Sequence, residues 1–161
     1  MQLDINTEKG QQSLSQERTL ISSAQAAYEG ILFIETNKSA PAQIDGFMVR
    51  NGEVVGVYES KCRNMTIEQM HRFNDEWLIT FEKILNGADL SKRLYVPFYG
   101  LLYLVQEPIG VILKITDEKG NILPRVRLEQ TSTQKTINGG SIIRTNAYVD
   151  IGTCHTFPII L

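Results

Sequence analysis

Apolar and polar positions recur along the chain with periods that separate helical from extended segments. In residues 13–29, apolar side chains return at the three- and four-residue spacing of one helical face, which predicts a helix. The apolar run at 31–36 predicts a short strand, and the polar stretch at 37–41 predicts a turn. The chain is therefore expected to open with a helix followed by a strand.

Two extended segments, residues 44–50 and 53–63, flank Asn51-Gly52, which is a strong signal for a tight hairpin. Side chains alternate between the two faces of a strand. The second segment is therefore expected to carry two sets of side chains, one face with Val55, Val57, Glu59 and Lys61, the other with Val54, Gly56, Tyr58 and Ser60.

The next helix has the clearest start signal. Thr66 is a natural N-cap, Gln69 completes a capping box, and Met65 and Met70 hold the positions of a hydrophobic staple. An apolar stripe then predicts one continuous helix that ends near Gly87. Its members are Met70, Phe73, Trp77, Phe81 and Ile84. The stripe is large enough for core packing, so Trp77 is assigned to the core rather than to base stacking.

The remainder is β-rich. Strands are expected at 94–98 and 111–116, a turn at 117–121, and a second hairpin from segments 126–137 and 141–151. This order predicts an α/β (α+β) fold, a central mixed β-sheet flanked by helices. We expect a single domain, with a core over about residues 13–116 and a C-terminal β-hairpin extension over about 117–161.

Composition narrows the function only slightly. The 161 residues are 42% hydrophobic and 21% charged, with a net charge of −2, and the pI is about 5.7. Domains that coat nucleic acid by bulk electrostatics are usually basic, so that class is disfavoured. An enzyme with a local basic groove remains compatible with this balance.

Cys62 and Cys154 are too few for a disulfide framework, and the N-terminus has no secretory signal. The longest apolar stretch, 94–105, is interrupted by Pro97 and Gly100 and falls short of the roughly 20 residues that span a bilayer. A cytoplasmic protein with no membrane partner is expected.

The candidate chemistry lies on the first hairpin. Asp45 begins one strand, and Glu59-Ser60-Lys61 comes near the end of the next. An acid-x-Lys triplet alone carries little information, since Asp117-x-Lys119 repeats it inside a predicted turn. Register decides whether the acids meet. A clean two-residue turn would send Asp45 and Glu59 to opposite faces, whereas a three-residue loop, or a bulge of the same effect, would put them on one face.

These residues resemble the motif of the PD-(D/E)XK nuclease superfamily. Asp45 precedes Glu59 by fourteen residues, Lys61 follows, and Glu17 lies on the first helix 28 residues before Asp45, a spacing similar to that of archaeal Holliday-junction resolvases. The order helix, strand, hairpin, helix is also similar. The resemblance covers about residues 13–100. Ile44 stands in place of the name-giving proline, and the chain from about residue 109 has no counterpart.

The resemblance implies a DNA-cleaving enzyme that uses Mg²⁺, with Mn²⁺ as a substitute, and that works as a homodimer. Asp45 and Glu59 would hold the metal, and Glu17 would complete its shell, although a first-turn acid complementing the helix dipole explains Glu17 equally well. Lys61 would orient the attacking water or stabilise developing charge. Gln69, apart from its capping role, and Arg63 are candidate substrate contacts. Arg125, Arg127, Lys135 and Arg144 are further basic residues that could contact phosphate, or simply form a solvated face.

Two other interpretations stay open. A domain of this fold could bind a partner or assemble into a larger particle without catalysis, which the acidic balance and the Thr-rich C-terminal hairpin favour. A non-nuclease enzyme could use Cys62 as a nucleophile, with His71 as its base, although no third orienting residue is evident. The cysteines and histidines do not have the spacing of a zinc site.

Overall fold

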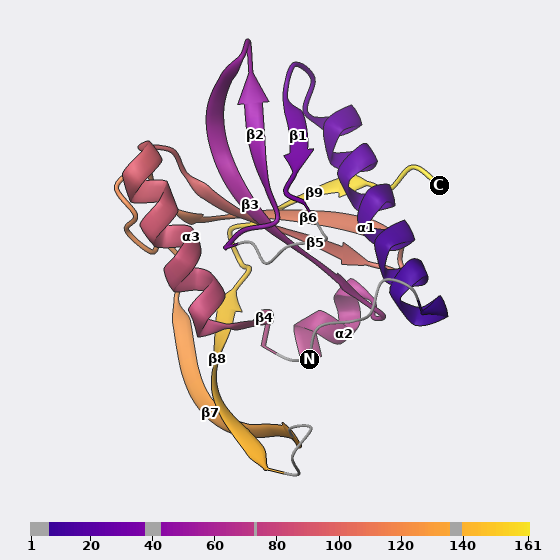
Figure 1. Ribbon diagram of the computed structural model, residues 1–161. Helices are drawn as coiled ribbons and strands as arrows, with labels where there is room; N and C mark the ends of the chain where they lie inside the picture. Colours follow the sequence, from indigo (N-terminus) through magenta and orange to yellow (C-terminus); the bar gives the residue numbers. More distant parts are fainter. Residues whose placement is uncertain (1–6, 38–42, 73, 136–139) are drawn as a thin grey trace.

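The computed structural model describes residues 7–37, 43–72, 74–135 and 140–161 of the chain (Figure 1). The helices are α1 (Glu8–Ala27), α2 (Ile67–Arg72) and α3 (Phe81–Leu94). The strands are β1 (Leu32–Glu35), β2 (Gly46–Arg50), β3 (Glu53–Arg63), β4 (Glu76–Thr80), β5 (Phe98–Leu104), β6 (Ile109–Thr116), β7 (Val126–Lys135), β8 (Ser141–Asp150) and β9 (His155–Pro158).

The strands form two sheets, and the fold is mixed α/β as predicted. The larger sheet has six strands in the order β1-β2-β3-β5-β6-β9. Its β3–β5 pair is parallel and its other pairs are antiparallel. The smaller sheet has the order β4-β8-β7 and is antiparallel throughout. The C-terminal segment is built into both sheets, because β9 extends the large sheet and β8 pairs with β4.

Helices α1 and α3 lie on opposite faces of the large sheet (Figure 1). On one face, Leu20 and Ala24 of α1 pack on Tyr58 and Leu101. On the other face, α3, Val57 and Trp77 share a hydrophobic cluster with residues of β8. The face of β3 that carries Val57 is therefore covered by α3 and by the small sheet, and this coverage decides how buried the polar residues of β3 become.

The predicted helix over residues 66–87 is wrong. The capping box forms, since Thr66 N donates to Gln69 Oε1 at 2.9 Å and Gln69 N to Thr66 Oγ1 at 3.2 Å. Helix α2 nevertheless ends at Arg72, and Asn74 and Asp75 have φ of 60° and 56°, which a helix cannot contain. The apolar stripe is shared between two helices and a strand, because pairing of β4 with β8 overrides the helical period.

Trp77 therefore lies on a strand, although its assignment to the core is confirmed at 2% exposure. Gly87 does not end a helix, because α3 continues to Leu94 and is followed by Tyr95 in the left-handed conformation. The strand expected at 94–98 is displaced for the same reason, and β5 begins only at Phe98. Phe73 lies outside the described residues.

Other local predictions are confirmed. The turn at 117–121 forms, with Asp117 Oδ1 accepting from the N–H groups of Lys119 and Asn121, both at 2.9 Å. The second hairpin forms as β7 and β8, and its turn lies outside the described residues. Most of the turn expected at 37–41 also lies outside them.

Gly100→Ala is expected to lower the free energy of unfolding by about 1–3 kcal/mol. A methyl group at this position of β5 would lie 2.1 Å from Cζ3 of Trp77, so the buried indole would have to move. Urea unfolding followed by tryptophan fluorescence measures the change. Gly152→Ala is the matched control, because its methyl group would meet only Asp150, at 3.1 Å from Oδ1. Equal stability of the two variants would contradict the expectation.

Candidate functional site

A β-bulge sets the register of the first hairpin. The turn contains only Asn51 and Gly52, both with positive φ, as a tight hairpin requires. The pairs Met48↔Gly56 and Val49↔Val54 leave Val55 as an extra residue on β3. This bulge is one of the two arrangements predicted to place Asp45 and Glu59 on the same face of the hairpin.

The bulge places Asp45 opposite Glu59, because Gly46 pairs with Tyr58 one position further along. The face assigned to Val55 is corrected by the same feature. Val55 packs with the cluster on the α1 face, whereas Val57 packs on the α3 face. The inserted residue moves Val55 to the face opposite to the predicted one. From Gly56 onward, the side chains of β3 alternate between the two faces as predicted.

Glu59 is the most unusual side chain of the group. It is 1% exposed, and neither carboxylate oxygen has a hydrogen-bond partner within the described part of the chain. The ammonium groups of Lys61 and Lys83 lie 3.6 Å and 3.5 Å from Oε1, at ion-pair rather than short hydrogen-bond distance. A buried carboxylate that is paired yet not hydrogen-bonded is costly, and such groups concentrate at functional sites.

Packing explains the burial of this carboxyl group. Glu59 pairs across the sheet with Gly100, and the Trp77 ring occupies the space above Gly100. Burial, and after it the charge of Asp45, raises the pKa of Glu59 to about 7. Lys61 and Lys83 act in the opposite direction. Near neutral pH the group therefore exchanges readily between its neutral and its ionised form.

Asp45 and Glu17 meet at Ser60, on the other side of β3. Asp45 Oδ2 accepts from Ser60 N at 2.8 Å and from Ser60 Oγ at 3.1 Å. Glu17 Oε1 accepts from the same hydroxyl group at 2.9 Å. Since a hydroxyl group has one proton, it can serve only one of these carboxylates at a time. Glu17 and Asp45 thus meet at the Ser60 hydroxyl group, and the charge of Asp45 acts on Glu59, the preceding residue of β3.

The backbone fixes Asp45 at the edge where β2 separates from β3. Its N–H donates to Tyr58 O at 3.0 Å, and its carbonyl accepts from Thr36 N at 2.8 Å. Its side chain accepts from the Ser60 N–H, because the pairing of β2 with β3 ends at Gly46 and Tyr58. Asp45 therefore lies between the two faces of the sheet. Glu17 shares the Ser60 hydroxyl group with it on one face, and the charge of Asp45 acts on Glu59 on the other.

Two members of this cluster were missed in the sequence. Ser60 occupies the variable position of the acid-x-Lys triplet, and strand alternation could have identified it as the residue that meets the first helix. Lys83 lies in the first turn of α3, where nothing in the sequence marks it, because that segment was assigned to the middle of a longer helix.

The two predicted substrate contacts have structural partners. Gln69 Oε1 is held by the capping box. The guanidinium group of Arg63 donates to the carbonyl groups of Cys62 and Leu78, both at 3.3 Å, and burial lowers its pKa. Arg127 is bound to Glu76 and Glu129. In the structure, Arg63 and Arg127 contact groups of the protein itself, and their contact with substrate stays a prediction.

The cysteine hypothesis finds no support. Burial raises the pKa of the Cys62 thiol to about 12, with a further contribution from Glu17, so the thiol is neutral at physiological pH. His71, its candidate base, contacts Asp75 through Nδ1 and is exposed to solvent.

The donor chemistry fits Mg²⁺, which prefers oxygen ligands and commonly takes one or two carboxylates together with water and substrate phosphate. Asp45 and Glu59 are the candidates for such a pair, and the Glu59 oxygens, which lack hydrogen-bond donors among the described residues while Oε1 faces two lysines, are the atoms that a cation would satisfy. Within the described residues, no three or more His, Cys, Asp or Glu side chains form a group that could hold a metal ion. A metal held by Asp45 and Glu59 would therefore need further oxygen ligands from water or substrate, and Glu17 contacts Ser60 instead.

The sequence matches no protein-family model and none of the curated proteins compared with it. Within the described residues, no helix has both the length and the apolar character needed to cross a membrane. Any functional assignment therefore depends on the geometry of this site.

Proposed function

We propose that this protein is a metal-dependent nuclease that hydrolyses DNA phosphodiester bonds, acting as an endonuclease. The observation that carries the proposal is the buried Glu59 carboxylate, electrostatically coupled to Asp45 and flanked by Lys61 and Lys83. The order of elements around it supports the resemblance noted in the sequence. The chain runs through α1, the antiparallel strands β1 to β3, α2, β4 and α3 to β5, which is parallel to β3, and it departs from the expected order in that β4 interrupts the two helices.

In this proposal, Asp45 and Glu59 would hold Mg²⁺ or Mn²⁺, and Glu17 would share the Ser60 hydroxyl group with Asp45. When bound, the ion would activate a water molecule and neutralise charge on the scissile phosphate. Lys61 orients the attacking water or stabilises the charge that develops on phosphorus oxygens, and Lys83 provides a second cation for the same task.

Substrate can approach this cluster from the lysine side. The side chains of Lys61 and Lys83 are about one-third exposed, at 35% and 33%, while Glu59 beneath them is buried. Lys83 also lines an open cavity of about 620 Å³ between α3 and β8, together with Thr80, Arg144 and Thr145. A phosphodiester backbone entering there would meet Lys83 and Arg144, together with the acid Glu82, before it met the buried Glu59.

Incubation of the protein with supercoiled, linear, single-stranded and branched DNA is expected to give cleavage with Mg²⁺ or Mn²⁺ and none with EDTA. Lys61→Gln is expected to reduce the rate at least about a hundredfold, since one donor to developing charge is lost. Lys119→Gln, from the second acid-x-Lys triplet, is the matched control and should cut like wild type. Cleavage that persists in EDTA, or cleavage of none of these substrates, would contradict the proposal.

A second candidate function is a nuclease-like domain without activity that serves as a binding or assembly module. The hairpin of β7 and β8 extends away from the large sheet (Figure 1). β4 pairs only with residues 146–150 of β8, so the outer part of the ribbon is paired only between its own strands. Ile143 lies on this outer part and is 71% exposed, and Leu128, which pairs with Ala147 in the three-stranded part, is 50% exposed. This arm could contact a second copy of the chain, and light scattering with Ile143→Ser would detect that role.

A further inference from the structure

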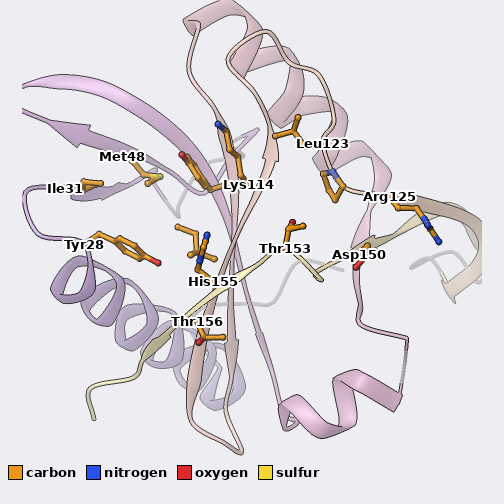
Figure 2. A pocket seen from close by; sticks show the side chains of 13 residues that line it. Tyr28, Ile31, Met48, Lys114, Leu123, Arg125, Asp150, Thr153, His155 and Thr156 are labelled. Carbon is orange, nitrogen blue, oxygen red and sulfur yellow. The ribbon is translucent and has the colours of Figure 1, made fainter.

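A cavity of about 880 Å³ lies on the α1 face of the large sheet, beyond the end of α1 (Figure 2). Helix α1 ends at Ala27, so it covers only part of this face. Tyr28 and Ile31 form one wall, and Leu123 and Pro124 form the opposite wall. Glu59 belongs to the other face, with α3, so this cavity is separate from the candidate catalytic cluster.

The floor of the cavity is apolar because Gly56 has no side chain, so that the side chains of Met48 and Tyr99 can lie over β3 at this position. A methyl group on Gly56 would lie 3.0 Å from Met48 Sδ and 3.1 Å from Tyr99 Cε2. Met48 and Tyr99 therefore meet above the strand, and Ile112 continues the surface on β6. Cavities of a few hundred to about 1,000 Å³ with mainly apolar linings and few polar groups are typical of small-molecule sites.

Two basic side chains interrupt this apolar surface at central positions. Lys114 pairs with Tyr99 across β5 and β6, and His155 pairs with Ile112 across β6 and β9. Lys114 and His155 are therefore diagonal neighbours on one face, roughly 7–8 Å apart at their backbones. Within the described residues, neither side chain has a hydrogen-bond or ion-pair partner. Figure 2 shows His155 at the centre of the cavity with the Tyr28 hydroxyl group directed toward it.

The only acid that lines the cavity among the described residues is Asp150, and its Oδ1 accepts from Gly152 N at 2.8 Å. Arg125 lines the rim, and its guanidinium group points outward in Figure 2. Lys114, which pairs with Tyr99 of the floor, therefore supplies a cation beside the apolar surface, while Asp150 contributes one negative charge at the cavity. An anionic head group with a planar apolar body is the complementary chemistry.

We propose that this cavity binds a free nucleoside monophosphate. Its phosphate would lie against Lys114 and His155, and its base would lie on the surface formed by Met48, Tyr99 and Tyr28. The walls on both sides favour a single small molecule over a continuous strand. The proposal does not depend on nuclease activity, because none of these residues belongs to the carboxylate cluster.

Titration calorimetry with AMP, GMP, CMP and UMP as probes tests this site. EDTA in the buffer keeps metal ions away from the cluster around Glu59. Binding is expected for at least one nucleotide, with a Kd that rises at least about tenfold in Lys114→Gln, since a charge-assisted hydrogen bond to the phosphate is lost. Lys9→Gln, on the exposed start of α1, and Glu59→Gln should bind like wild type. The corresponding nucleoside and inorganic phosphate should each bind more weakly.

Three results would overturn the proposal: no binding of any nucleotide, equal affinity in Lys114→Gln, or binding of a short oligonucleotide alone. His155→Gln provides an independent variant if Lys114→Gln fails to fold, as judged by its thermal unfolding. Loss of nucleotide binding with DNA cleavage intact, or the reverse, would separate this proposal from the proposed nuclease activity.

Discussion

Glu59→Gln is expected to abolish Mg²⁺-dependent DNA cleavage, with a rate loss of at least about a hundredfold. The substitution keeps the shape of the side chain and removes the negative charge that would hold the cation. The amide can still occupy the space beside Lys61 and Lys83, so the fold should persist. Single-turnover cleavage of labelled DNA over a range of Mg²⁺ concentrations measures the loss, and circular dichroism checks the fold.

Glu68→Gln is the matched control for this variant. Glu68 is an exposed acid on α2 whose partner is Arg72 at 3.2 Å, and its side chain is 77% exposed. Its removal should leave cleavage within about twofold of wild type, since surface pairs contribute little. Wild-type rates in Glu59→Gln would show that the acid-x-Lys triplet is not the catalytic centre.

The free energy of unfolding is expected to fall as pH rises from about 4.5 to about 7, by on the order of 3 kcal/mol from Glu59 alone. The ordinary pKa of this carboxyl group is 4.5 and burial raises it to about 7 in the folded protein. Between these values the folded state binds more protons than the unfolded state. Raising the pH therefore destabilises the fold, and the full stability is present only below 4.5.

Urea titrations of wild type and Glu59→Gln across this pH range measure the contribution of Glu59 together with its coupling to Asp45, because groups distant from Glu59 titrate alike in both proteins. The difference between the two stabilities should change with pH in the direction stated, and Mg²⁺ should stabilise wild type at pH 8 but not Glu59→Gln. Parallel curves for the two proteins would mean that Glu59 is not held in a desolvated environment, and the proposed site would lose its physical basis.

Local signals in the sequence were sufficient for several elements. Periodicity located α1, Asn51-Gly52 located the first hairpin, and the Thr66–Gln69 capping box located the start of α2. They failed between residues 72 and 98, where apolar residues fit both a helical stripe and the alternation of a buried strand. Pairing of β4 with β8, a contact between residues about 70 positions apart, decided that segment.

For the candidate site, the chain's own pattern named Glu17, Asp45, Glu59 and Lys61 and left the register between Asp45 and Glu59 open. Only the tertiary structure decided that register, because the bulge at Val55 places Asp45 opposite Glu59. The burial that raises the pKa of Glu59 was equally hidden, since the residues over this part of β3 and β5, such as Trp77 above Gly100, come from distant parts of the chain. Spacing along a chain fixes which groups can meet, whereas desolvation depends on neighbours that are distant in sequence.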